Sequence, residues 1–400
     1  MTSYQDIVAV GMARTPMGKF GGSLKDTSVH ELGRAVLKEA LKRAGITGAM
    51  LNEVIFGCCR QAGNGPNPAR TASVMAEIPI EVPVFTLNMA CPSAMKSLDL
   101  AAQSLVLHPE GFAAAGGMDS MSTIPHLLKA HRWRGFKMGP VSLEDGWSDS
   151  VDPLIGQSMG ETAENLVDKY QLSREDLDQL ALESHQKAFR AQSAGLFDDE
   201  IVHLSLPGGG KSGDILFQKD ETIRPDCDLE KLGVLKTSFK KDGKITAGNS
   251  CGLSDGASAV ILCERKTAKD LGIKPLFSLV SFAQAAAEPV LMGEGPGIVM
   301  PLALRKAGLT LSDMDLLEVN EAFSAQILVN ERQMKWDRDR LNVHGGAIAL
   351  GHPTGSSGAR ILITGYHALK ARDKEFLLAG ICGGGGVTTA MIIKRENDSV

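Results

Sequence analysis

Two cysteines, a histidine and an asparagine stand in segments punctuated by glycine or proline: Cys91, Asn320, His352 and Cys382. A thiol can carry an acyl group as a thioester, and an imidazole can take the proton of that thiol. The second thiol is then left to move another proton. This set of side chains therefore points to acyl transfer through a cysteine.

Cys91 is the candidate nucleophile. It stands just before Pro92-Ser93-Ala94, and proline suits a first helical position, so we expect the thiol at a helix N-terminus. The helix dipole and a nearby imidazole would both stabilise a thiolate there. The alternative is the role of a small buried hydrophobe. We expect that role for four other cysteines: Cys58, Cys59, Cys227 and Cys263.

The candidate acid and base lie near the end of the chain. Cys382 precedes Gly383–Gly386, where missing side chains let backbone N–H groups approach a developing oxyanion. His352 lies in a constrained segment of small residues and is the best base candidate. Asn320 follows an apolar strand, so its amide could hold a water or an oxyanion, or cap the next helix.

An internal repeat would bring these residues together. Residues 40–46 (ALKRAGI) resemble residues 303–309 (ALRKAGL), and each predicts a helix closed by a glycine and followed by an apolar strand. Residues 91–94 (CPSA) match residues 352–355 (HPTG), and an apolar run ending in glycine follows both. Four matches in the same order predict two βαβ-type halves, with the candidate nucleophile and base at equivalent helix N-termini.

Length and composition fit this architecture. The 400 residues include 44 glycines, 43% hydrophobic and only 5% aromatic residues, which predicts a tightly packed α/β protein of two or three domains. Residues 121–250 differ in character and look like an inserted domain, with a helix that begins at Ser173 through a capping-box-like motif. Residues 208–213 (GGGKSG) predict a surface turn, because their spacing does not make a phosphate-binding loop.

Charge and hydropathy narrow the range of partners. The net charge of −5 with mixed signs argues against a nucleic-acid binder. No stretch approaches the roughly 20 apolar residues of a membrane span, and Ile7–Val10 predicts a first strand rather than a signal peptide. Seven cysteines without framework spacing predict reduced thiols, and no metal-ligand array appears. We therefore expect a cytoplasmic protein that binds neither nucleic acid, membrane nor metal.

Taken together, these residues resemble the thiolase family, the acetyl-CoA acetyltransferases and 3-ketoacyl-CoA thiolases, over nearly the whole chain. Further matching motifs are residues 13–22 (ARTPMGKFGG), 67–70 (NPAR), 117–118 (GM) and 159–165 (MGETAEN). The resemblance implies a duplicated thiolase fold with a layered α/β/α/β/α core and an inserted loop domain. It implies three parts: residues 1–120 completed by about 251–270, the insert 121–250 over the coenzyme A site, and residues 271–400.

The resemblance also implies a role for each site residue. Cys91 would be acylated after activation by His352, and Cys382 would be the acid and base at the carbon–carbon bond. Asn320 would position a water that forms one oxyanion hole with His352, while the N–H groups of Cys91 and Gly384 form the other. The reaction would be thiolytic cleavage of 3-ketoacyl-CoA, or the reverse condensation of acetyl-CoA, with ping-pong kinetics. Such a protein would act in fatty acid and lipid metabolism.

Coenzyme A and its thioesters would be substrates, and no cofactor would stay bound permanently. The family typically assembles as a homodimer or homotetramer. The residues implied to bind coenzyme A are Met159, Arg224, Phe239, Ala247, Cys251, Leu253, Met292 and Phe323.

Several positions depart from the usual family pattern, and they leave alternatives open. Pro92, Ala94 and Cys251 replace more usual residues, so a low-activity or scaffold subunit of an acyl-transfer complex is an alternative. A ketoacyl-synthase type of condensing enzyme would use one cysteine and two histidines, which the presence of Cys382 disfavours. Ser158 stands where short-chain members usually carry histidine, and Trp147 lies in a locally lengthened stretch, so the acyl chain length is open.

Overall fold

The computed structural model describes residues 3–129, 131–147, 151–208 and 213–396. A ten-stranded mixed sheet runs through both halves of the chain in the order β12-β13-β14-β11-β1-β10-β5-β3-β4, with β2 paired to β10. Its strands are β1 (Ile7–Arg14), β2 (Gly18–Lys19), β3 (Leu51–Gly57), β4 (Val84–Leu87), β5 (Phe112–Ser120), β10 (Ser254–Glu264), β11 (Phe277–Ala286), β12 (Leu316–Val319), β13 (Phe376–Cys382) and β14 (Val387–Arg395).

The sheet repeats one pattern on either side of its centre. Outward from β1, strands β10 and β5 pair antiparallel and β3 then pairs parallel. Outward from β11, strands β14 and β13 pair antiparallel and β12 then pairs parallel. The predicted helix ends also match, because Gly45 closes α1 (Val29–Ala44) and Gly308 closes α8 (Gly295–Ala307), both with left-handed backbone. The two-half organisation predicted from the repeat is confirmed.

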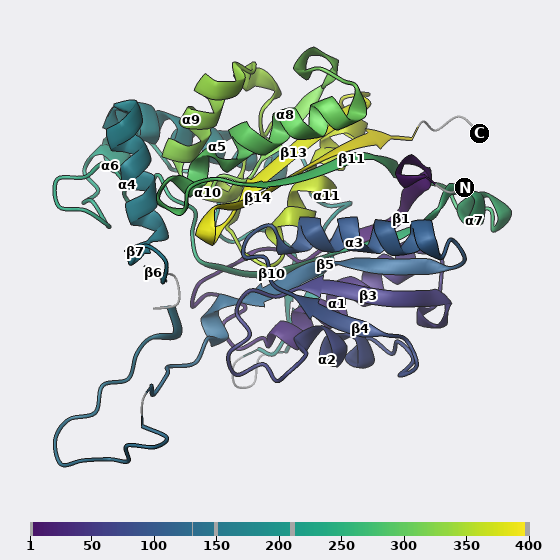
Figure 1. The fold of residues 1–400 in the computed structure, drawn as a ribbon, viewed down its shortest axis with the longest axis horizontal. Helices are drawn as coiled ribbons and strands as arrows, with labels where there is room; N and C mark the ends of the chain where they lie inside the picture. Colours follow the sequence, from purple (N-terminus) through teal and green to yellow (C-terminus); the bar gives the residue numbers. More distant parts are fainter. Residues whose placement is uncertain (1–2, 130, 148–150, 209–212, 397–400) are drawn as a thin grey trace.

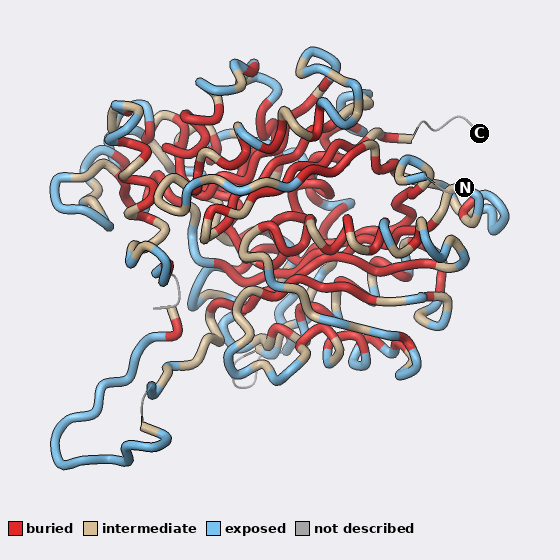
Figure 2. The backbone as a smooth tube through the Cα atoms, in the orientation of Figure 1, coloured by how far each residue is buried: buried red, intermediate tan, exposed pale blue. Residues whose placement is uncertain are grey.

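The helices form layers around the sheet (Figure 1). Helices α1 and α2 (Pro68–Met75) cover the outside of the N-terminal half, and α8 and α9 (Ser324–Met334) cover the outside of the C-terminal half. Helices α3 (Ser93–Leu107) and α11 (Ser357–Ala371) lie between the halves, in a core cluster with residues from both. This is the layered α/β/α/β/α core that the resemblance implied, and its interior is buried throughout (Figure 2).

The two central helices approach each other closely. A side chain at Gly358 of α11 would lie 2.5 Å from the backbone nitrogen of Met95 in α3, so only glycine fits there. Met95 and Leu98 of α3 are fully buried, and each stabilises the fold by roughly 1.5–3 kcal/mol. Close packing of α3 on α11 brings the loops before both helices to one place.

One prediction about these loops is wrong. Pro92 is the N-cap of α3 rather than its first residue, and Pro353 lies four positions before α11 begins at Ser357. The reason is local, since the N–H groups of Ser356 and Ser357 close a turn on the carbonyl of Pro353 at 3.0 and 3.1 Å. The two loops are therefore related by the repeat but differ in shape.

The segment between the halves contains helices α4 (Met159–Tyr170), α5 (Arg174–Ser193) and α6 (Leu229–Gly233), joined by long irregular stretches. The predicted start of α5 is confirmed, because Ser173 Oγ accepts a hydrogen bond from the N–H of Asp176 at 3.0 Å. Two small hairpins pair β6 (Val151–Asp152) with β7 (Gln157–Ser158) and β8 (Leu204–Leu206) with β9 (Ile215–Phe217). Of the predicted glycine-rich turn, residues 209–212 lie outside the described residues.

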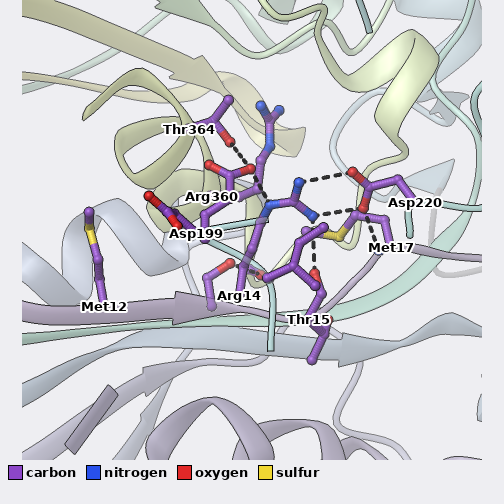
Figure 3. A network of polar contacts seen from close by, with 12 residues as sticks. Met12, Arg14, Thr15, Met17, Asp199, Asp220, Arg360 and Thr364 are labelled. Atoms are coloured by element: carbon purple, nitrogen blue, oxygen red, sulfur yellow. Dashed lines mark hydrogen bonds and ion pairs between the residues drawn. The ribbon is translucent and has the colours of Figure 1, made fainter. Parts of the chain in front are cut away.

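A buried arginine fixes this segment to the body of the protein (Figure 3). Arg14, at the end of β1, donates hydrogen bonds to Glu200 Oε1 at 2.6 Å and to both Asp220 carboxylate oxygens at 2.7 and 2.9 Å. Thr364 of α11 donates to the same Glu200 oxygen at 3.1 Å. All three charged side chains are buried, so removing one partner would cost about 3–5 kcal/mol. Within the described ranges, no helix combines the length and apolarity needed to cross a bilayer.

Candidate active site

The loop between β4 and α3 presents Cys91. It is held closed by Ser93, whose hydroxyl accepts from the N–H of Met89 at 2.8 Å and donates to the carbonyl of Ala90 at 2.6 Å. Ala90 adopts a φ of 52°, which turns the chain sharply just before the thiol. Cys91 is partly buried and lies two residues before the first turn of α3.

His352 is almost fully buried, and its tautomer follows from its partners. The hydroxyl of Ser357 donates to the carbonyl of Pro353 at 3.0 Å, so at 2.7 Å it accepts from the Nδ1–H of His352. This arrangement leaves Nε2 as an acceptor. Burial first, and then the charges of Arg360 and Arg60, lower the pKa of His352 to about 3, so the ring is neutral at pH 7.

Asn320 lies directly behind this ring. It follows β12, is fully buried, and its Nδ2 is 3.5 Å from His352 Nε2. Its N–H donates to the carbonyl of Gly380 at 3.0 Å. The alternative that Asn320 caps the next helix is wrong, because α9 begins at Ser324 after an N-cap at Phe323.

Cys382 ends β13 and is 1% exposed. Burial raises the pKa of its thiol well above the ordinary value, and negative charge on a Cys91 thiolate would raise it further. A glycine turn follows, and a side chain at Gly383 would lie 2.6 Å from the ring of Pro92. The absence of that side chain lets the Cys382 loop of one half reach the Cys91 loop of the other.

The resting Cys91 is a neutral thiol. Burial raises its pKa to about 11, although the charge of Arg60 and the backbone N–H groups of Gly384 and Cys91 itself lower it. These N–H groups therefore face the sulfur and favour negative charge at that point. A neutral imidazole and a neutral thiol can exchange a proton at the moment of attack.

A single cavity of about 1010 Å³ is lined by Cys91, His352, Cys382 and Gly384. Asn320 is not among the lining residues and reaches the cavity only through His352. The eight residues implied to bind coenzyme A also line it: Met159, Arg224, Phe239, Ala247, Cys251, Leu253, Met292 and Phe323. The rings of Phe239 and Phe323 meet edge to face with centroids 6.2 Å apart. The structure thus brings these candidates to one place.

The departures from the family pattern are accommodated. Ala94 is fully buried in the core shared by both halves, and Pro92 is the N-cap of α3. Burial, followed by the charge of Cys91, raises the pKa of Cys251 to about 12, so this thiol is neutral where a serine hydroxyl is usual. Among the described residues, no group of three or more His, Cys, Asp and Glu side chains could hold a metal ion.

Sequence reasoning missed several residues of the cavity wall. Cys59 was expected in the core, yet it lines the cavity, and its thiol donates to the carbonyl of Ala90 at 3.0 Å. Arg60 and Trp147 line the cavity as well. No local signal marks these residues: Cys59 and Arg60 reach the cavity because they follow β3 at the end where its parallel neighbour β4 leads to Cys91.

Comparison with known proteins agrees with this geometry. The family model described as "Thiolase, N-terminal domain" matches residues 7–266, and "Thiolase, C-terminal domain" matches residues 273–395. An acetyl-CoA acetyltransferase of Cupriavidus necator is 44% identical over 394 residues, which cover 98% of this chain and 100% of that protein.

Two solved structures are similar over almost the full length. The acetyl-CoA acetyltransferase of Bacillus anthracis superposes with a TM-score of 0.95 at 40% identity, covering 99% of this chain and 100% of that one. The human mitochondrial 3-ketoacyl-CoA thiolase superposes with a TM-score of 0.94 at 38% identity, covering 98% and 99%. The similarity therefore extends across both halves and the segment between them.

Proposed function

The chain belongs to the thiolase family, and we propose that it is an acetyl-CoA C-acyltransferase in which Cys91 carries the acyl group. Thiolytic cleavage of a 3-ketoacyl-CoA and the reverse Claisen condensation are the reactions of this family. The observation that carries the residue assignment is that Cys91, His352 and Cys382, from opposite halves, line one cavity.

The first half of cleavage forms the acyl-enzyme. His352 Nε2 takes the proton of Cys91, and the sulfur attacks the C3 carbonyl of the 3-ketoacyl-CoA. The C2–C3 bond then breaks, its electron pair passes to C2 of the departing acetyl-CoA enolate, and Cys382 gives C2 a proton. The raised pKa of Cys382 suits this step, because the thiol is protonated when the carbanion forms.

The second half transfers the acyl group to coenzyme A. The Cys382 thiolate takes the proton of the coenzyme A thiol, and the coenzyme A sulfur attacks the thioester on Cys91. The bond to Sγ then breaks, and the proton held by His352 passes back to the Cys91 sulfur. The N–H groups of Cys91 and Gly384 would stabilise the oxyanion of this thioester. The amide of Asn320, 3.5 Å from His352 Nε2, would hold a water that serves the other carbonyl.

Coenzyme A would enter through the part of the cavity covered by residues 121–250. Arg224 is exposed at this cavity and could meet a phosphate, while the apolar side chains of Met159, Phe239 and Met292 would pack on the pantetheine arm. In this division the insert serves binding, residues 1–120 with about 251–270 supply the nucleophile, and residues 271–400 supply the acid and base.

We also propose a homodimer or homotetramer. Strand β4 lies at an edge of the large sheet, and its Phe85 is 41% exposed, so a second copy could pair along it. Three further apolar side chains are exposed on the excursion that projects from the body (Figures 1 and 2): Trp133, Phe136 and Met138. All seven cysteines are free thiols, which fits the reducing cytoplasm.

The alternative of a scaffold subunit is not favoured. Both cysteines, the histidine and the asparagine of the reaction are present, and the unusual Pro92 and Ala94 leave the nucleophile at the start of α3. An assay of the isolated protein with acetoacetyl-CoA and coenzyme A tests this directly. Formation of two acetyl-CoA molecules per turnover is expected. A folded protein that cleaves neither this substrate nor a longer 3-ketoacyl-CoA would contradict the proposed function.

A further inference from the structure

Arg60 is a charged residue of the cavity wall that the reaction above does not use. It lies in the loop after β3, and β3 pairs parallel with both β4 and β5. The carboxyl ends of these strands therefore open on the same edge, where Cys91 follows β4. Arg60 and Cys91 both line the cavity.

The backbone around Arg60 is fixed. The N–H groups of Cys59 and Arg60 donate to Asp119 Oδ1 at 3.1 and 3.0 Å, and Asn64 Nδ2 donates to the carbonyl of Arg60 at 2.8 Å. The other oxygen of Asp119 accepts from the hydroxyl of Thr354 at 2.7 Å, two residues after His352. Arg60 is thus held relative to the base of the reaction.

The side chain of Arg60 stacks on Trp147. Its guanidinium carbon lies 4.5 Å from the centre of the indole ring, and Trp147 lines the same cavity. The positive charge lowers the pKa of both Cys91 and His352, after the larger effect of burial, so it acts on both reacting groups. Arg60 is partly buried, whereas Arg224, the other arginine of the described lining, is exposed.

We propose that Arg60 and Trp147 form a subsite for a carboxylate at the far end of the acyl chain carried by Cys91. The preferred substrate class is then a 3-ketoacyl-CoA whose acyl chain ends in a carboxylate, a specificity that rests on the proposed function. A guanidinium can bind a carboxylate through two parallel hydrogen bonds while its flat face stays on an aromatic ring. Gln61 and Asn88 line the same cavity, and their amide nitrogens already donate one hydrogen bond each, to the carbonyls of Cys58 at 3.0 Å and Cys59 at 3.3 Å. The second N–H of each amide is a further donor.

The position of the charge matches the fragment that stays on the enzyme. When the C2–C3 bond breaks, acetyl-CoA leaves with the electron pair and a proton at C2, and the acyl fragment that begins at C3 remains bonded to Cys91 through the C3 carbonyl carbon. That retained part carries the terminal carboxylate. Attack by the thiolate of coenzyme A then releases it as a carboxylate-bearing acyl-CoA. A neutral alkyl end would instead cover the charge of Arg60 with apolar surface and give it no polar partner, which disfavours binding of such a chain.

Steady-state thiolysis of three substrates by the full-length enzyme tests the proposal. The probes are acetoacetyl-CoA, 3-ketohexanoyl-CoA and 3-ketoadipyl-CoA, the last two having equal chain length and differing in the terminal carboxylate. We expect the unmodified enzyme to favour 3-ketoadipyl-CoA over 3-ketohexanoyl-CoA by about 10- to 100-fold in kcat/KM, the range of a charge-assisted hydrogen-bonded pair. Arg60→Gln should abolish that preference, mainly through KM, and Arg60→Lys should keep part of it.

The controls separate this role from the others that Arg60 could have. Arg34→Gln removes an exposed arginine of α1 and should leave the preference intact. If Arg60→Gln slows all three substrates equally, the residue serves only the thiol, and the proposed subsite is wrong.

Equal cleavage of both six-carbon substrates by the unmodified enzyme also overturns the subsite while leaving the proposed function standing. Failure to cleave any substrate overturns the function itself, and the subsite with it. If Arg60→Gln does not fold, two other measurements test the carboxylate subsite. They are the preference of the unmodified enzyme for 3-ketoadipyl-CoA over 3-ketohexanoyl-CoA and the part of that preference that Arg60→Lys keeps.

Discussion

The two halves of the large sheet share a strand pattern but hold their reactive residues differently. In the N-terminal half, Cys91 is partly buried in a loop at the start of α3. In the C-terminal half, His352 and Cys382 are 4% and 1% exposed. A nucleophile has to meet its substrate and carry the product of attack, whereas an acid and a base work better where burial sets their pKa. The repeat therefore supplies one frame for two distinct tasks.

The difference arises from short loops rather than from the sheet. In the N-terminal half, the chain passes from Cys91 through Pro92 directly into a helix. In the C-terminal half, the equivalent histidine is followed by a turn before α11, and this turn brings the Ser357 hydroxyl back to the ring at 2.7 Å. The halves meet where Gly383 packs against Pro92.

The largest effect is expected from removing the proposed nucleophile of the N-terminal half. We expect Cys91→Ala to lower kcat for acetoacetyl-CoA thiolysis by about 10⁴-fold or more, because no other group in the account forms the thioester. Cys227→Ala, at a partly buried cysteine away from the cavity lining, is the matched control and should retain activity. Substantial turnover by Cys91→Ala would assign the acyl group to another residue.

The next largest effect tests the positioning of the base. Ser357→Ala removes the acceptor of the Nδ1–H of His352, so the ring loses its fixed tautomer and orientation. We expect kcat to fall by about 10- to 100-fold, less than the full 10²–10⁴-fold contribution of a general base. Ser357→Thr keeps the hydroxyl and should recover most of the rate. A Ser357→Ala enzyme with unchanged kcat and pH profile would show that the ring is oriented by other contacts.

The contact between the halves can be tested at Gly383. A methyl group there would meet the Pro92 ring at 2.6 Å, so Gly383→Ala should move the Cys382 loop away from the Cys91 loop. Overpacking of this kind costs about 1–3 kcal/mol, and thermal unfolding would measure it together with the loss of kcat. Gly233→Ala, in α6, is the matched control, because Gly233 has nothing within 4 Å of the added carbon and, like Gly383, no left-handed backbone. Full activity and stability in Gly383→Ala would contradict the close packing of the Cys382 loop against Pro92 in the Cys91 loop.

The smallest effect concerns pH. The folded pKa of His352 is about 3, below its ordinary value of 6.5, so the unfolded chain binds more protons between these values. This histidine therefore contributes stability above pH 6.5 that is lost as the pH falls toward 3. Denaturant unfolding at pH 7 and pH 5 measures the free energy of unfolding of the unmodified enzyme and of His352→Asn. We expect the stability of the unmodified enzyme, relative to that of the variant, to fall by about 2 kcal/mol or less between pH 7 and pH 5. If the unmodified enzyme instead becomes more stable relative to the variant at pH 5, the imidazole is charged in the folded state.

Much of this arrangement could be predicted from local sequence. The repeated ALKRAGI and ALRKAGL segments predicted two helix ends that fold alike, and glycine spacing marked the loop after Cys382. These signals lie within a few residues and act through backbone conformation. They pointed to Cys91, His352 and Cys382 as candidate site residues without any knowledge of the distances between them.

The remaining features depend on contacts between distant segments. Cys59 was assigned to the core because nothing in its neighbourhood shows that β3 and β4 end side by side. Arg60 meets Trp147 across 87 positions of sequence, and Glu200 and Asp220 reach Arg14 from the insert. Such contacts are set by the tertiary structure and leave no local pattern.

Peptide mapping of the Cys382→Ser enzyme after a brief reaction with acetyl-CoA tests the central claim most directly. This variant keeps Cys91 and His352 but lacks the thiol that moves the proton at carbon. We expect an acetyl group on the peptide containing Cys91 and no condensation product. Acetyl label on another residue, or normal condensation by this variant, would contradict the proposed roles of Cys91 as acyl carrier and Cys382 as the acid and base at carbon.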